Sequence, residues 1–137
     1  MSKNEHLYKA KKAKNDEFYT RIEDIEKELS HYTEQLKDKW VYSPCDDYRW
    51  SNFHKYFTEH FTELGLKHYT CTNYDIGDGA YRMDYDGENT TITQLDGDGD
   101  FRSEECTDIM KQSDIVITNP PFSLFRQFIN WLNNDGE

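Results

Sequence analysis

The stretch Ser113-Asp114-Ile115-Val116-Ile117-Thr118-Asn119-Pro120-Pro121-Phe122 decides the predicted fold. Its β-branched run at 115–117 predicts a short strand that is buried on both faces of a parallel sheet. The strand must end at Asn119, because a residue before proline avoids the helical region and two prolines lack the amide donors of a sheet ladder. We therefore expect a stiff loop at the carboxyl end of a strand, where open α/β sheets place their chemistry. Apolar residues at helical spacing then predict a following helix: Leu124, Phe125, Phe128, Ile129, Trp131 and Leu132.

The tetrapeptide Asn119-Pro120-Pro121-Phe122, between a strand and a helix, resembles the catalytic motif of the amino-group DNA methyltransferases of the adenine N6 type. The resemblance implies that the Asn119 amide oxygen and a proline carbonyl accept hydrogen bonds from the two N–H groups of an adenine amino group. It also implies that Phe122 stacks on an adenine flipped out of double-stranded DNA. On the residues alone, a surface turn remains the alternative, because Asn-Pro commonly starts turns.

Length and composition limit the possible functions. The 137 residues suffice for one core, and a net charge of −11 with a pI near 4.8 has the wrong sign for a broad DNA-gripping surface. Cys45, Cys71 and Cys106 are widely spaced and form no Cys-x-x-Cys pair, so we expect neither a metal site nor a disulfide framework. These features predict a reduced, cytoplasmic protein, and no apolar stretch reaches membrane-spanning length.

The first part of the chain contains a basic arm and a helix. Residues 1–14 are polar and lysine-rich, and we expect them to be flexible. Apolar residues recur at helical steps over about 21–37, with Thr20 as the expected N-cap. Phe18-Tyr19-Thr20 resembles the N-terminal motif that amino methyltransferases close over the methionine part of S-adenosyl-L-methionine. A hydrophobic staple at the helix start is the alternative for the aromatic pair.

A strand, an acidic loop and a second helix follow. The strand is expected at 39–43, and an aromatic-faced helix at 53–64 ends at Gly65. The loop between them lacks the Gly-x-Gly of a Rossmann unit and is similar to the corresponding loop of the EcoRI adenine methyltransferase family. The resemblance implies a cofactor site: Asp46 or Asp47 for the ammonium group, and Ser51, Asn52 and nearby amides for the carboxylate. Ordinary helix capping is the alternative for Asp47 and Ser51.

A second strand at 67–72 ends just before Asp75. In related folds an acidic residue at about this place contacts the cofactor ribose, so we predict that role for Asp75. Alternating residues at 80–85 and 90–95 around a turn then predict a hairpin, whose second arm we expect to supply the third strand of the sheet.

The segment Asp96-Gly97-Asp98-Gly99-Asp100-Phe101 has the alternating aspartates of a calcium loop, but Phe101 occupies the place where an EF-hand needs glycine. It resembles instead the motif that binds the cofactor's adenine. That resemblance implies that Asp100 accepts a hydrogen bond from the adenine amino group and that Phe101 packs on the ring. A short helix at 104–110 is expected to follow.

The order of these motifs matches the EcoRI-like adenine methyltransferases from residue 14 to the end of the chain. The resemblance implies an α/β, Rossmann-like class I S-adenosylmethionine-dependent fold with a mostly parallel sheet, a DNA adenine N6-methyltransferase activity of the restriction-modification type, and a bacterial or phage origin. We expect residues 15–137 to be a partial catalytic domain, incomplete at its C-terminal side and without a target-recognition region.

Two alternatives remain. The acidic chain can be a non-catalytic DNA mimic or interaction protein. The acceptor can also be RNA, a protein glutamine or a small molecule, because related motifs occur in such methylases. The sequence does not indicate an oligomeric state.

Overall fold

The computed structural model describes residues 20–135, which form a five-stranded sheet in the order β4-β3-β2-β1-β5. The strands are β1 (Trp40–Ser43), β2 (His68–Thr72), β3 (Tyr81–Tyr85), β4 (Thr90–Gln94) and β5 (Ile115–Val116). The predicted basic arm and the aromatic pair Phe18-Tyr19 lie outside the described residues.

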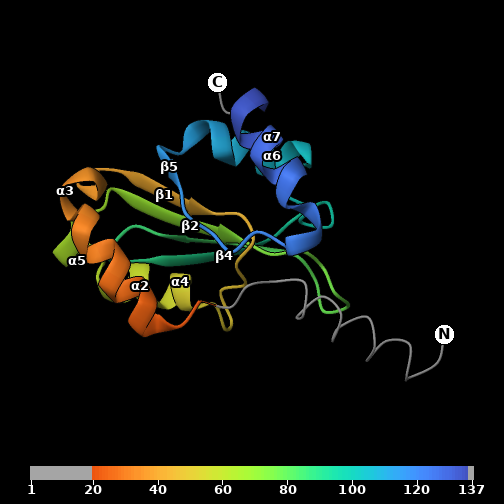
Figure 1. The fold of residues 1–137 in the computed structure, drawn as a ribbon. Helices are drawn as coiled ribbons and strands as arrows, with labels where there is room; N and C mark the ends of the chain where they lie inside the picture. Colours follow the sequence, from red (N-terminus) through yellow and green to blue (C-terminus); the bar gives the residue numbers. More distant parts are fainter. Residues whose placement is uncertain (1–19, 136–137) are drawn as a thin grey trace.

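Helices cover both faces of the sheet (Figure 1). On one face lie α2 (Ile22–Leu29), α4 (Asn52–Glu59) and α5 (Phe61–Leu64), and on the other lie α6 (Glu104–Gln112) and α7 (Phe125–Asp135). Neighbouring residues of β1 show the alternation: Val41 packs with the first group of helices and Tyr42 with the second. Each face therefore buries its own apolar cluster.

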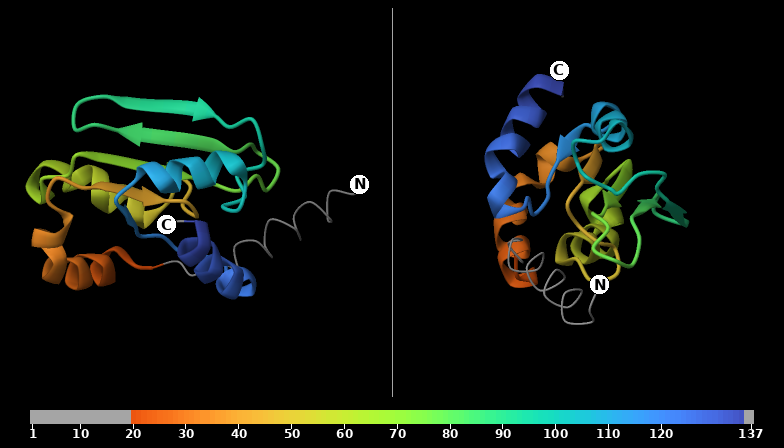
Figure 2. Two further views of the ribbon diagram at one scale, coloured as in Figure 1. Left: turned by 90° about the horizontal axis from the view of Figure 1, so that it is seen from above. Right: turned by 90° about the vertical axis from the view of Figure 1, so that its right-hand side faces the viewer.

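The sheet is mixed, and this corrects the expectation of a mostly parallel one. β1 pairs in parallel with β2 and β5, whereas β2–β3 and β3–β4 are antiparallel. The hairpin itself is confirmed, but its first arm, β3, pairs with β2, and the second arm is an exposed edge strand. It lies at the end of the sheet away from β5 (Figure 2). Four residues, 86–89, connect β3 to β4 and return the chain antiparallel, since a parallel neighbour would need a crossover connection.

Other local expectations were confirmed in part. The helix predicted at 21–37 is interrupted by a 3-10 turn, η1 (Ser30–Tyr32), before α3 (Thr33–Leu36). Gly65 ends α5 with φ 69°, the left-handed conformation expected of a glycine cap. β5 is only half-buried: Ile115 packs with the cluster on one face and Val116 with the cluster on the other, but among the described residues the strand has a sheet neighbour on one side only. After the double proline the chain forms η2 (Phe122–Leu124) and then α7.

Candidate active site

The predicted catalytic and cofactor loops meet at one edge of the sheet. Because β1, β2 and β5 run parallel, their carboxyl ends lie side by side, and the loops at 44–51, 73–80 and 117–121 leave from that edge. Three short bonds join the first and third loops at their base: the Ser43 hydroxyl donates to the Ile117 carbonyl at 2.5 Å, the Cys45 amide donates to the Thr118 hydroxyl at 2.8 Å, and Thr118 donates to Asp46.

A pocket opens between the loops after β1 and β5 and Thr20, which lies just before the N-cap of α2. It brings together positions that are far apart in sequence, from Thr20 through the loop after β1 to the motif after β5. Its lining residues are Thr20, Cys45, Asp46, Asp47, Trp50, Ser51, Asn52 and Asn119. Six of the predicted site residues therefore share one pocket.

Asp46 is the most connected of these residues and is only 3% exposed. Its Oδ1 accepts from the Ser51 hydroxyl at 2.7 Å and from Asn119 Nδ2 at 2.9 Å. Its Oδ2 accepts from the Thr118 hydroxyl and from the Asn119 amide, the latter at 3.1 Å. Burial raises the pKa of Asp46 to about 6, although the bonds from Thr118, Ser51 and Asn119 act in the opposite direction. A carboxylate has about four acceptor positions, and here four donors occupy them.

Asn119, the candidate catalytic residue, is 7% exposed and held on both sides of its carboxamide. Its Nδ2 donates to Asp46, and its Oδ1 accepts from the Thr20 hydroxyl at 2.8 Å. Thr20 is thus no helix cap as predicted: the N-cap of α2 is Arg21, which makes no capping side-chain bond, and the hydroxyl of Thr20 faces Asn119 instead. Asn52 donates to the Thr20 carbonyl at 3.0 Å, which ties α4 to the same segment.

The rest of the tetrapeptide follows Asn119 in the chain. Pro120 and Pro121 are half-buried, and Phe122 begins η2 with 59% of its surface exposed. Phe122 does not line the pocket, and its stacking on a base stays a prediction.

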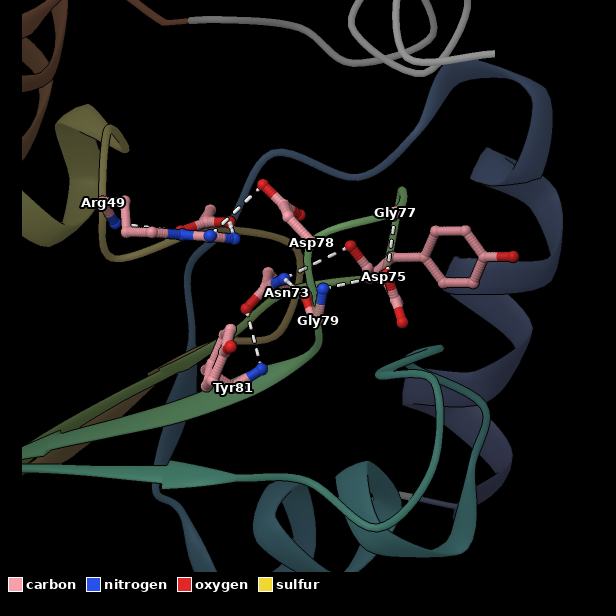
Figure 3. Close-up of polar contacts among 9 residues, drawn as sticks. Arg49, Asn73, Asp75, Gly77, Asp78, Gly79 and Tyr81 are labelled. Atoms are coloured by element: carbon pink, nitrogen blue, oxygen red, sulfur yellow. Dashed lines mark hydrogen bonds and ion pairs between the residues drawn. The ribbon is translucent and has the colours of Figure 1, made fainter. Parts of the chain in front are cut away.

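Asp47 is buried but already paired. Arg49 holds it in a fork, with Nε to Oδ1 at 2.9 Å and Nη2 to Oδ2 at 2.6 Å. The same guanidinium reaches Asp78 Oδ2 at 3.2 Å on the loop after β2, and lies 4.9 Å from the Trp50 ring centre and 5.3 Å from that of Tyr81. Arg49 therefore ties the loop after β1 to the loop after β2 (Figure 3).

The loop after β2 is organised by its own polar side chains. Asn73 donates to the Gly79 carbonyl at 2.9 Å and accepts from the Tyr81 amide at 2.9 Å (Figure 3). Asp75 Oδ1 accepts from the amides of Gly77 and Gly79 at 2.8 and 3.0 Å, and these bonds lower its pKa. Asp75 lies where the sequence predicts it, just after β2, but it does not line the pocket.

Asp100 and Phe101 lie away from the pocket. Asp100 pairs with Arg102, and this hydrogen-bonded pair lowers the pKa of Asp100. Phe101 is 3% exposed and packs edge-on against Phe128 and Trp131 of α7. In this structure the Phe101 ring faces the core, so its role with the cofactor adenine stays a prediction. The loop nonetheless contacts the loop after β2, where the Asp75 amide donates to the Asp98 carbonyl at 2.8 Å.

Sequence reasoning missed Thr118, Trp50 and Arg49. Thr118 bonds the central carboxylate, Trp50 lines the pocket while 45% exposed, and Arg49 neutralises Asp47. Each is a polar or aromatic residue in a loop directly after a parallel strand, and that position is the signal that identifies them. Among residues 20–135, no group of three or more His, Cys, Asp or Glu side chains is placed to hold a metal ion. No helix in that range has the length and apolar character needed to cross a membrane.

Comparison with known proteins matches this chain to one family. The family model described as "Adenine-specific methyltransferase EcoRI" matches residues 6–135. The Type II methyltransferase M.EcoRI of Escherichia coli is 45% identical over 94% of this chain and 45% of its own length. The Type II methyltransferase M.MpnI of Mycoplasma pneumoniae is 43% identical over 96% of this chain and 41% of its own length. The chain therefore spans less than half the length of these relatives. No solved structure gives a significant match.

Proposed function

Since this chain belongs to the family of the EcoRI adenine-specific methyltransferase, we propose that residues 20–135 form the cofactor-binding and catalytic part of a DNA adenine N6-methyltransferase. The observation that carries the proposal is the convergence of Thr20, the loop after β1 and Asn119 on one pocket. A charge-mimicking protein has no need of such convergence, because its function depends on surface carboxylates alone.

The chemistry of the pocket fits S-adenosyl-L-methionine. The first turn of α4 opens at Ser51 and Asn52, and the free amides of a helix N-terminus suit the carboxylate of the cofactor's amino acid part. Asp47, which also lines the pocket, is paired with Arg49. The exposed Trp50 offers an apolar face beside them. On this arrangement the parallel strands 1, 2 and 5 correspond to the cofactor half of a Rossmann-like class I methyltransferase fold.

The bound cofactor supplies an electrophilic methyl group, and the residues of this chain align and activate the acceptor. Asn119 Oδ1 would accept a hydrogen bond from one N–H of the adenine amino group, and the Pro120 carbonyl would accept one from the other, which favours a pyramidal nitrogen. As this nitrogen bonded to the methyl carbon, the sulfonium–methyl bond would break, S-adenosylhomocysteine would leave, and one amino proton would pass to solvent. Phe122 stacks on the flipped adenine, and the prolines keep the acceptors rigid. The rate gain comes mainly from alignment of two reactants in a fixed geometry.

Isothermal titration of the chain with S-adenosyl-L-methionine tests this proposal. We expect binding that Asn52→Ala weakens about tenfold, equivalent to about 1.4 kcal/mol, because this side chain lines the pocket and holds the Thr20 carbonyl. Asn130→Ala on the exposed side of α7 is the matched control and should bind as the parent chain does. A folded chain that binds no cofactor, or one in which both variants lose affinity equally, would contradict the proposal.

A further inference from the structure

We propose that Asp46 is a positioning residue that fixes the orientation of the Asn119 carboxamide, together with Thr20, and is not itself a ligand of the cofactor. The inference rests on the proposed function only for the use to which the Asn119 oxygen is put. The geometry that carries it is independent of any ligand.

The chemistry of the two partners defines which way the carboxamide points. A carboxylate only accepts hydrogen bonds, so the side of Asn119 that faces Asp46 Oδ1 at 2.9 Å must be its NH₂ group. The carbonyl oxygen then faces the Thr20 hydroxyl, which donates to it at 2.8 Å. A carboxamide flipped by half a turn would place its oxygen against a carboxylate oxygen and lose the bond to Asp46. The orientation is therefore set by Asp46 from one side and by Thr20 from the other.

Asp46 also holds the backbone of the catalytic loop. The Asn119 amide donates to Asp46 Oδ2 at 3.1 Å, and the hydroxyl of the preceding residue, Thr118, donates to the same oxygen. The next two residues are prolines, which have no N–H, so the amide of Asn119 is the last backbone donor before Phe122. One carboxylate thus fixes both the main chain and the side chain of Asn119.

The same contacts leave Asp46 no acceptor position for a cofactor ammonium group. Ser51, Thr118 and Asn119 supply four donors to its two oxygens. Asn119 Oδ1, in contrast, has a second lone pair beside the one that Thr20 uses, and it can accept one N–H bond from a substrate. The Asn119 oxygen is therefore already in place before the substrate binds. Such a preorganised acceptor needs little reorganisation during the reaction.

Nuclear magnetic resonance of the Asn119 side-chain amide reads the orientation directly, without any need for activity. The pair of NH₂ signals is assigned by its loss in Asn119→Asp. We expect Asp46→Asn to shift these signals strongly, whereas Asp47→Asn leaves them nearly in place. Asp47→Asn is the matched control because Asp47 is also a buried carboxylate of the same pocket but bonds Arg49 and not Asn119. Signals of Asn119 that respond alike to both changes, or to neither, would overturn the proposal.

A second pair of variants tests the arrangement from its other side and does not depend on the folding of Asp46→Asn. Thr20→Val removes the hydroxyl at nearly constant volume and should shift the Asn119 signals, while Thr20→Ser, which keeps a hydroxyl, should restore them. Thr58→Val, which removes a hydroxyl that bonds the His54 carbonyl within α4, is the control and should shift nothing at Asn119. Equal spectra for Thr20→Val and the parent chain would show that Thr20 does not hold the carboxamide.

Titration with S-adenosyl-L-methionine separates a positioning role from a binding role. Asp46→Asn should change the dissociation constant by less than about threefold, because the carboxylate makes no contact with the ligand. A loss of affinity of about thirtyfold or more would show that Asp46 binds the cofactor and would overturn that part of the proposal. If the parent chain binds no cofactor, the proposed function fails, but the amide signals still decide the orientation.

Discussion

Asp46→Asn removes a carboxyl group whose protonation is coupled to folding. Burial is the largest influence on this group, and it raises the pKa in the folded chain to about 6 from an ordinary value of 3.8. Because the folded chain holds the proton more tightly, the stability that Asp46 contributes is fully present below pH 3.8 and is lost as the pH rises through about 6. The interval between 3.8 and 6 corresponds to about 3 kcal/mol for a group that is 3% exposed.

The assay is urea unfolding of the parent chain and of Asp46→Asn at a series of pH values on both sides of 6. The difference between the two unfolding free energies isolates Asp46, because other groups, such as Asp84 with its pKa of about 2, titrate in both chains. The titratable neighbours Tyr69 and Cys71 on β2 stay protonated in this range, since burial raises the pKa of each. We expect the parent chain to lose about 2 kcal/mol relative to Asp46→Asn between pH 4 and pH 7, most of the full effect. A constant difference, or one of opposite sign, would show that the four hydrogen bonds outweigh burial.

Three further substitutions test other parts of the site. Arg49→Met leaves the buried Asp47 carboxylate unpaired and should lower the free energy of unfolding by about 2 kcal/mol, seen as a lower melting temperature. It should also weaken the binding of S-adenosyl-L-methionine. Arg102→Met, which breaks a more exposed ion pair, should change neither the melting temperature nor the binding. Gly99→Ala should cost about 3 kcal/mol in unfolding free energy, because φ is +79° and the new Cβ would lie 1.8 Å from the Asn73 carbonyl oxygen, whereas Gly97→Ala meets only the end of a flexible side chain and should be nearly neutral. Phe101→Ala should cost about 3–5 kcal/mol by urea unfolding, as expected for a buried ring; a variant of parental stability that no longer binds cofactor would instead support the predicted contact with the cofactor's adenine.

The elements that the sequence predicted well are those whose signal is local. Trp40–Ser43, His68–Thr72 and the helix from Glu104 follow from β-branched or aromatic runs and from capping residues, and the structure has them within a few residues of the predicted bounds. The 3-10 turn at Ser30–Tyr32 had no such signal, since the apolar spacing continues through it. The pairing of β3 with β2 also had none, because the residues of a hairpin do not say which arm joins the rest of the sheet.

The site was predictable as a set of loops but not as a set of contacts. The positions of Asn119, Asp46 and Ser51 after parallel strands placed them at one edge of the sheet, and the structure lines a single pocket with them. The hydrogen-bond partner of each carboxylate depends on how close the fold brings loops that are far apart in the sequence. Asp46 therefore bonds residues 5, 72 and 73 positions away, and Phe101, predicted to face a ligand, packs on α7.

The mixed sheet explains how the site tolerates a departure from a wholly parallel arrangement. The pocket is lined by Thr20 and by residues of the loop after β1, the start of α4 and the loop after β5. These segments need β1 to run parallel to β5, and the loop after β2 reaches them through Arg49 because β2 is also parallel to β1. The antiparallel hairpin lies beyond β2, at the opposite end of the sheet from β5, where the Tyr81 ring faces Arg49 and the Tyr81 amide bonds Asn73. The reversal of β3 therefore leaves the pocket edge of the sheet unchanged, and the three parallel strands are the part of the fold on which the proposed chemistry depends.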